Sequence, residues 1–548
     1  MPYLTKVMKQ VEAATTPPRP LCASVAKTLA AFDRITAPGD DERVAKIEVH
    51  DTVSKVAWAY EKLRNAIDYQ DEHLLRKNAI ERILRRRLVA DITAEQVAEP
   101  LVLELIRGGY LANNAIPVTM LASAANVVNI YIHVWTQVPT LADHTEMDRL
   151  FDWYLSLLAV ELNELLSPVE HEVALAQLMF DTIHRDIVFV EDDIPEEEKN
   201  IQLYIAIQRV LLKSDSSMIR YHLFRRQHPE WHEPTPEVIA SIGQNLPLIK
   251  QAIDQQLFHP AGELLQRLMK KYAIIFLIFS DIAEQYGPAA AETLTHPDQI
   301  VKDVTAAYNQ RKKTVQRKIA RSVIRSIIYV FITKMLLALV IELPFDRLLA
   351  HGGKVNYRPL LTNIIIHPVI LFLIGVTIRP PGQKNEEAVI AKVQTLLYRG
   401  DDRNALVKPR KPIRRSSIFT YFYRVIYALT FVLVFGLLIW GLRKLEFNPV
   451  GMAVFLLFLT IVSFFGIRVR LLAKELVVVD QRENIFSILF DFFTVPILQV
   501  GRWISLRAPK VNVLIFFFDV IIEAPFKAFL EAMEGFFGFL REKREEIY

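Results

Sequence analysis

The sequence predicts an all-α protein: a cytoplasmic helical bundle followed by a polytopic α-helical membrane domain with amphipathic C-terminal helices. Hydrophobic residues make up 52% of the 548 residues, and the mean hydropathy is +0.21, both high for a soluble protein. The apolar excess is concentrated after about residue 326, which indicates a membrane half. Only 18 glycines are present, too few for turn-rich sheets, so helices are favoured.

The first part of the chain predicts a tether and then a soluble bundle. Residues 1–42 contain the helix-breaking stretches "TTPPRP" and "APGDD", which predict a flexible N-terminal tether. From 43 to 310 one amphipathic pattern follows another, and in "VSKVAWAYEKLRNAI" Val53, Val56, Tyr60 and Leu63 share one stripe. This range predicts a soluble cytoplasmic helical bundle of one or two subdomains, large enough for its own core.

Four segments of the membrane domain, 326–480, are predicted to span a bilayer. They cover about 326–343, 360–378, 421–442 and 448–467, and each is near the roughly 20 residues that a spanning helix needs. Lys and Arg are dense before the first span, between the second and third, and after the fourth. The excess of basic residues on cytoplasmic loops places these segments inside. The sequence therefore predicts a multi-pass membrane protein with its N-terminus and C-terminus both cytoplasmic.

A basic juxtamembrane helix, 311–325, precedes the first span. Lys313, Arg317, Arg321 and Arg325 stand at spacing four and so share one helix face. Such a cluster attracts anionic lipid by about 1 kcal/mol per basic residue, so the expected partner is a lipid bilayer with anionic headgroups. The alternative is an orientation signal without a ligand. Nucleic acid is not expected, because the cluster adjoins a span and has no interleaved aromatic residues.

The C-terminal segment, 481–548, predicts two amphipathic helices that are interfacial or re-entrant. A thin polar stripe containing Asp491, Asp519 and Glu523 runs through otherwise apolar sequence. A wide apolar arc with a narrow polar stripe suits a helix lying in the membrane interface. Two further spans are the alternative, which the sequence leaves open.

A lysine inside the first span raises the main question of function. Lys334 lies nine residues before the end of that span at Leu343, and His367 lies seven residues after the start of the second at Leu360. At 1.5 Å per residue the two depths are about 13 and 11 Å. Because a short loop makes these helices antiparallel neighbours, we expect Lys334 to donate a hydrogen bond to neutral His367 or to a backbone carbonyl.

Two further polar residues extend this candidate intramembrane polar site. Asn363 lies one turn from His367, and Glu342 lies about two turns from Lys334. Ionisable groups inside a membrane are a functional hypothesis by default. Two structural alternatives remain: Lys334 extends along its helix to the interface, or it pairs with Asp491 or Asp519.

No catalytic pattern is found, so we expect no enzyme, cofactor or metal. His228 and His232 have metal-ligand spacing, but Pro229 between them favours a loop. In "HEVAL" Leu175 stands where an H-E-x-x-H motif needs its second histidine. The single cysteine, Cys22, excludes internal disulfides and cysteine-based zinc clusters.

The expected function is therefore an integral membrane scaffold or interaction protein. About half of the chain is a soluble bundle without catalytic signatures, and that bundle would recruit a protein partner whose identity the sequence does not give. The alternative is a small-solute or ion transporter or channel that uses the intramembrane Lys, His and Asn residues.

Overall fold

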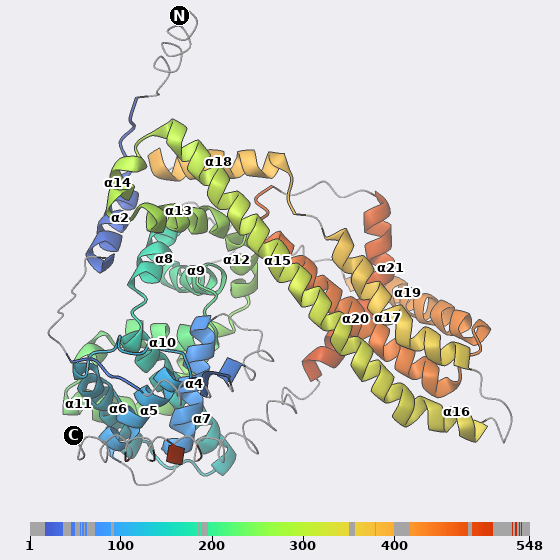
Figure 1. Ribbon diagram of the computed structural model, residues 1–548, viewed down its shortest axis with the longest axis horizontal. Coiled ribbons are helices and arrows are strands. Elements are labelled where there is room, and N and C mark those ends of the chain that lie inside the picture. The colour runs from blue at the N-terminus through green and yellow to red at the C-terminus, as the bar shows by residue number, and fades with distance from the viewer. Residues whose placement is uncertain are drawn as a thin grey trace, which may run out of the picture. The chain divides into compact units, whose positions relative to one another are not determined.

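A computed structural model of the chain is all-α, with no strand among the residues that it describes. The predicted fold class is confirmed: a helical N-terminal part precedes long apolar helices in the C-terminal half (Figure 1). Isolated described positions lie between 55 and 62, at 187 and between 529 and 539. The continuous described ranges are 17–36, 45–49, 72–88, 93–184, 195–349, 357–378, 380–398, 417–479 and 485–507.

The chain folds into two compact units. The membrane unit comprises Met1–Leu29, Arg185–Asp192 and Lys270–Lys510, and the bundle unit comprises Ala30–His184, Asp193–Met269 and Val511–Tyr548. Residues 270–310 therefore group with the apolar helices, although the sequence assigns them to the soluble bundle. The boundary expected at residue 310 falls inside one continuous helix, α15 (Pro297–Leu337).

The bundle unit is built around one hydrophobic core. Its helices are α4 (Glu72–Arg87), α5 (Ala94–Arg107), α6 (Thr119–Thr136), α7 (His144–Leu166), α8 (Glu170–Ile183), α9 (Glu196–Val210), α10 (Ser216–Gln227), α11 (Pro236–Leu257) and α12 (Ala261–Met269), with a 3₁₀ turn η2 (Pro229–His232). Helix α7 is the most deeply buried: Leu150, Leu157 and Leu162 are fully covered. Its start is defined by Asp143, whose carboxylate accepts a hydrogen bond from the Thr145 amide.

The N-terminal segment differs from the predicted tether. Residues 23–36 form helix α2 (Ala23–Thr36). Val25, Leu29 and Phe32 are buried at a spacing of four and three, which places them on one helix face. The segment is therefore held by apolar packing, a feature that the flanking prolines obscure in the sequence.

The membrane unit contains the long helices of the chain and a smaller group of helices beside them. After α13 (Ala273–Tyr286), η3 (Gly287–Ala289) and α14 (Ala290–Thr293), helix α15 continues through a π-helical segment η4 (Ala338–Glu342) into α16 (Leu343–Leu349). The remaining helices are α17 (Tyr357–Thr377), α18 (Gln383–Tyr398), α19 (Ser417–Lys444), α20 (Pro449–Lys474) and α21 (Ile485–Arg507).

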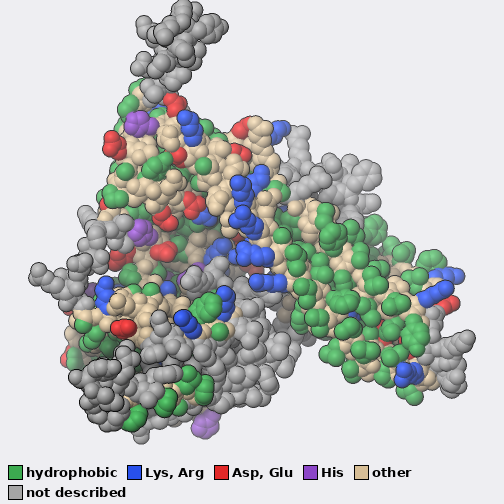
Figure 2. All heavy atoms as spheres, in the orientation of Figure 1, with side chains coloured by type: hydrophobic (Ala, Val, Ile, Leu, Met, Phe, Trp, Pro, Cys, Tyr) green, Lys and Arg blue, Asp and Glu red, His purple; other side chains and the backbone are tan. Residues whose placement is uncertain are grey.

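Four helices of the described ranges are long and apolar enough to cross a membrane: the helix from Pro297 to Leu348, α17, the part of α19 from Tyr421, and α20. Their surfaces expose large apolar side chains such as Leu336, Val376, Val432 and Trp440. Figure 2 shows hydrophobic side chains covering this face. Because water does not tolerate so large an apolar surface, these helices fit a lipid environment.

Helices α15, α17 and α20 pack closely at glycines. A β-carbon on Gly375 of α17 would lie 2.8 Å from the Val323 side chain, and one on Gly466 of α20 would lie 2.8 Å from Ile374. Lipid tails are as apolar as leucine, so close backbone approach through small residues is a main source of helix association in membranes. The three helices are therefore held at short distance.

Helix α21 packs against α20 and α19. A β-carbon on Gly501 would collide with the Thr460 carbonyl, and the Tyr427 hydroxyl donates to the Gln499 side chain over 2.8 Å. The expected interfacial or re-entrant tail stays a prediction. Asp519 and Glu523 lie outside the described residues, and so does the side chain of Asp491.

Candidate functional site

The structure brings Lys334, Glu342, Asn363 and His367 together inside the membrane unit, and we call these four residues the membrane polar cluster. Lys334 and Glu342 come from α15 and its π-helical continuation, and Asn363 and His367 come from α17. Lys334, Asn363 and His367 are 0% exposed and Glu342 is 3% exposed. The side chains of the cluster are therefore closed off within the unit.

A side-chain amide connects the two opposite charges of the cluster. The Lys334 ammonium donates a hydrogen bond to Asn363 Oδ1, and Asn363 Nδ2 donates to Glu342 Oε1 over 2.6 Å. Lysine has only donors and an ionised carboxylate only acceptors, so the amide can face them in one orientation only. The Lys334 ammonium also lies 4.5 Å from the centre of the Phe458 ring on α20, a cation–π contact.

The π-helical segment sets the direction of Glu342. Eight residues of regular α-helix would rotate Glu342 by about 80° from Lys334. One wide π turn absorbs about one residue, which reduces the offset to about 20°. The segment Ala338–Glu342 lies between the two residues, so the irregular turn is what lets both side chains reach Asn363.

His367 links α17 to α20. Its Nδ1 lies 3.0 Å from the Asn363 carbonyl oxygen, and its Nε2 lies 3.1 Å from the Phe455 carbonyl oxygen. The ring also meets the Phe455 ring edge-on, with centroids 4.7 Å apart. A neutral imidazole carries one N–H and can donate to only one of these carbonyls, whereas an imidazolium can donate to both.

The bonding of Lys334 differs from the sequence-based expectation. The sequence predicts that Lys334 donates to His367 or to a carbonyl, but its donor bond goes to Asn363, and His367 is bonded to backbone instead. Lys334 is also fully buried, so its ammonium does not extend to the interface. Depth along each helix is readable from sequence, whereas the rotation of each helix is not.

The predicted lipid-contact residues lie on the surface of α15. Lys313, Arg317, Arg321 and Arg325 are all exposed, and Figure 2 shows Lys and Arg side chains gathered over the middle of this helix. Arg311 beside them is engaged differently: its guanidinium donates to both carboxylate oxygens of Asp281 on α13 and to the Leu277 carbonyl. Their role in lipid contact stays a prediction.

Sequence analysis missed Asn385 on α18. Its amide donates to the Tyr308 hydroxyl over 3.0 Å and to the Leu476 carbonyl over 2.7 Å. Its oxygen accepts from the Val478 and Val479 amides. Asn385 thereby fastens α15 to the end of α20. No motif marks this residue, since it stands in an ordinary polar helix start.

A half-buried carboxylate beside the core of the bundle unit was also missed. Glu161 accepts hydrogen bonds from the Tyr131 hydroxyl at 2.8 Å and the Trp231 indole at 2.9 Å. Burial raises the pKa of the Glu161 carboxyl, and these two donors partly oppose the rise. Glu161 is therefore satisfied as an interior acceptor by two side chains of the described core.

The histidine-rich stretch covers the end of α10 and the turn that follows it. Residues 229–232 form the 3₁₀ turn η2, where the prolines indicated a loop. His228 lies 3.5 Å from Glu230, and His222 lies 3.1 Å from Glu164. Among the described residues, no group of three His, Cys, Asp or Glu side chains is placed to hold a metal ion.

Removing Lys334 alone should destabilise the membrane unit. Lys334→Met removes the donor to Asn363 and a cation near the Glu342 carboxylate. A buried polar group left without its partner costs about 1–3 kcal/mol, and more where a charge is involved. Lys334→Met/Glu342→Gln removes both charges and should recover most of that loss. In detergent micelles, we expect the melting temperature of the single variant to be well below those of the double variant and the wild type.

The exposed Lys444→Met change on α19 is the matched control and should leave the melting temperature unchanged. A single Lys334→Met variant as stable as the wild type would show that the Lys334–Glu342 interaction does not stabilise the fold.

Comparison with known proteins adds no relative: no protein-family model matches the chain, and neither a curated protein nor a solved structure is significantly similar to it.

Proposed function

We propose that this chain is an integral membrane scaffold or interaction protein whose helical bundle recruits a protein partner, without catalysis. The observation that carries the proposal is the closure of the membrane polar cluster. Its ammonium, amide and carboxylate bond to one another at 0–3% exposure. Polar side chains that hydrogen-bond to one another across helices contribute to helix association in membranes, so this cluster fits a structural role.

The length of α15 also supports an anchoring role. This helix has 41 residues, about 62 Å at 1.5 Å per residue. Its apolar half carries the polar cluster, and its other half is fixed by Arg311 to α13 and by Tyr308 to α18. A continuous helix fastened at both ends is suited to hold segments outside the membrane in a fixed position relative to the spans.

The proposal includes the orientation expected from the basic residues. Both termini, the bundle unit and α18 would lie in the cytoplasm, and the α19–α20 connection would lie outside. The support is the distribution of Lys and Arg around the spans.

A proton-coupled transporter or channel for a small solute or ion is the second candidate. His367 is the observation that favours it, because both ring nitrogens face carbonyl oxygens and only the protonated ring satisfies both. A buried histidine next to Lys334 and Glu342 has the composition of a proton relay.

The scaffold proposal predicts a partner that depends on the exposed apolar residues of the bundle unit. Leu248 on α11 is 65% exposed, and Phe258 at the end of α11 is 71% exposed. Such exposed apolar side chains are the residues of the bundle unit that we expect to contact a protein partner. The full chain would be purified from its native membrane in detergent, and retained proteins quantified by mass spectrometry. We expect the wild type to retain one partner in stoichiometric amount. The Leu248→Ser/Phe258→Ser variant should retain at least about tenfold less of it, the effect expected when one hot spot of an interface is lost.

Val173→Ser on α8, which is 47% exposed, is the matched control and should retain that partner. The proposal fails if no protein is retained in stoichiometric amount, or if both variants retain the partner equally. In proteoliposomes with an internal pH indicator, the scaffold proposal predicts no proton flux above empty vesicles. Flux that His367→Phe abolishes would establish the second candidate instead.

The orientation is tested with single cysteines in a Cys22→Ser background. Leu445→Cys, in the α19–α20 connection, should react with a membrane-impermeant maleimide added to intact cells. Gln383→Cys, exposed at the start of α18, should react only after permeabilisation. The reverse pattern of labelling would overturn the assigned orientation.

A further inference from the structure

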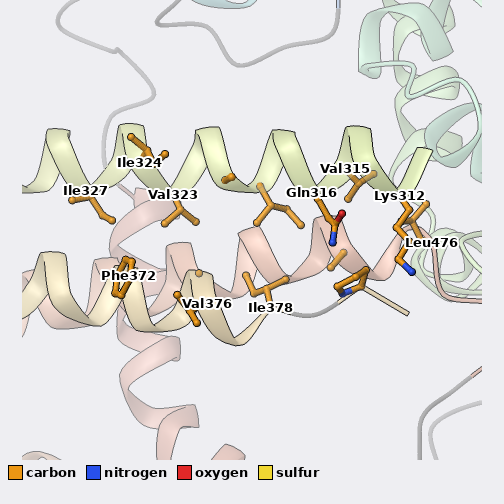
Figure 3. A pocket seen from close by; sticks show the side chains of 15 residues that line it. Lys312, Val315, Gln316, Val323, Ile324, Ile327, Phe372, Val376, Ile378 and Leu476 are labelled. Atoms are coloured by element: carbon orange, nitrogen blue, oxygen red, sulfur yellow. The ribbon is translucent and has the colours of Figure 1, made fainter. Parts of the chain in front are cut away.

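A cavity of about 370 Å³ lies between α15, α17 and the end of α20. Lys312 and Leu476 lie at one end, and Ile327 and Phe372 lie at the other (Figure 3). All lining residues belong to the membrane unit. The volume lies within the range of small-ligand sites in proteins.

The cavity exists because α17 ends before α15 does. The two helices meet closely where Gly375 approaches Val323. Two residues later α17 stops, at Thr377, while α15 runs on toward its N-terminus. The apolar face of α15 around Val315 and Ile319 then packs with the end of α20 and with Ile378, which follows α17. A groove remains along α15, and we call it the α15 groove.

The α15 groove is apolar along its length and polar at one end. Lys312 and Gln316 are the polar side chains of its lining, and both lie toward the end marked by Leu476 (Figure 3). At the other end Ile324 and Phe372, each 56% exposed, form part of the surface of the apolar helices. The groove therefore opens toward the hydrocarbon at one end and toward the membrane surface at the other.

The length of the α15 groove matches one lipid chain. Lys312 and Ile327 are fifteen residues apart, about 22 Å along a helix. One leaflet of hydrocarbon is about 15 Å thick, half of a bilayer core of about 30 Å. A single acyl chain fits the apolar part, and the remaining length accommodates a headgroup beside Lys312.

The charge at the polar end selects the headgroup. No hydrogen bond or ion pair engages the Lys312 ammonium within the part of the chain that the structure describes, whereas its neighbour Arg311 is bonded to Asp281. The exposed residue Arg317, five residues or about 8 Å further along α15, adds positive potential near this end. A phosphate at this position gains a charge-assisted hydrogen bond from Lys312, and the Gln316 amide can supply a second donor.

We propose that the α15 groove binds one anionic phospholipid, with an acyl chain against Val323 and Phe372 and the phosphate on Lys312. This ligand is a membrane lipid and is independent of the protein partner proposed above. The site also differs from the lipid contact expected from sequence, because Lys313, Arg317, Arg321 and Arg325 are absent from the groove lining. A defined lipid in this position would fill the gap between α15 and α17.

The test uses the full chain in phosphatidylcholine nanodiscs that contain a trace of photoactivatable lipid with a diazirine on its acyl chain. The probe is either phosphatidylglycerol or phosphatidylcholine, and cross-linked peptides are identified by mass spectrometry. In the wild type we expect phosphatidylglycerol to label the groove segments 315–327 and 372–378 more strongly than phosphatidylcholine. Lys312→Gln should lower the phosphatidylglycerol labelling about fivefold, the factor that corresponds to one basic contact near a membrane surface.

Lys474→Gln is the matched control, because Lys474 is exposed beside the groove residue Ala473 and is absent from the lining. It should leave the labelling unchanged. Ala320→Phe places a ring in the groove and should remove labelling by both probes. Equal labelling by the two probes in the wild type would overturn the proposal, since it indicates ordinary bilayer lipid. An equal loss for Lys474→Gln and Lys312→Gln would also overturn it, because diffuse attraction would then account for the preference.

Discussion

Charge buried among apolar helices is the constraint on which the membrane unit depends. Lys334 and Glu342 are buried among apolar helices, where a charged residue costs about 2.5–3.5 kcal/mol even on the scale of helix insertion. The Asn363 amide lowers that cost by bonding both charges at once. Lipid tails solvate apolar side chains as well as a neighbouring helix does. The polar cluster, together with the close contacts at Gly375 and Gly466, therefore determines which helix faces meet.

The rotation of α15 is also fixed outside the apolar helices, by contacts near Arg311. Arg311 and Lys334 stand on one helix, 23 residues or about 35 Å apart. Rotation of α15 about its axis would break the Lys334 bond at one end and the Arg311–Asp281 pair at the other. The same rotation would carry Val315 and Ile319 away from α20 and change the α15 groove. These contacts therefore fix α13 and α18 relative to the apolar part of α15.

The sequence predicts the features that depend on composition and on the depth of a residue along a helix. It does not predict those that depend on the rotation of a helix about its axis or on irregular backbone. Hydropathy located the four apolar helices, and residue counting put Lys334 and His367 at similar depth. The sequence does not predict that Asn363 bonds to both Lys334 and Glu342. The π turn at Ala338–Glu342 that orients Glu342 has no sequence signature. Asn385 and Glu161 went unnoticed since each is a single polar residue in an amphipathic helix whose partners come from distant segments. Helix α2 lies where the neighbouring prolines predict a tether, because its apolar stripe is short.

The central claim is that the membrane polar cluster is a closed structural element. An electron cryomicroscopy map of the full chain in lipid nanodiscs, at a resolution that separates side chains and ordered water, tests it most directly. We expect continuous density from the Lys334 ammonium through the Asn363 amide to the Glu342 carboxylate, with no chain of water reaching either membrane surface. A water-filled path from this cluster to one surface, with Lys334 turned into it, would contradict the account.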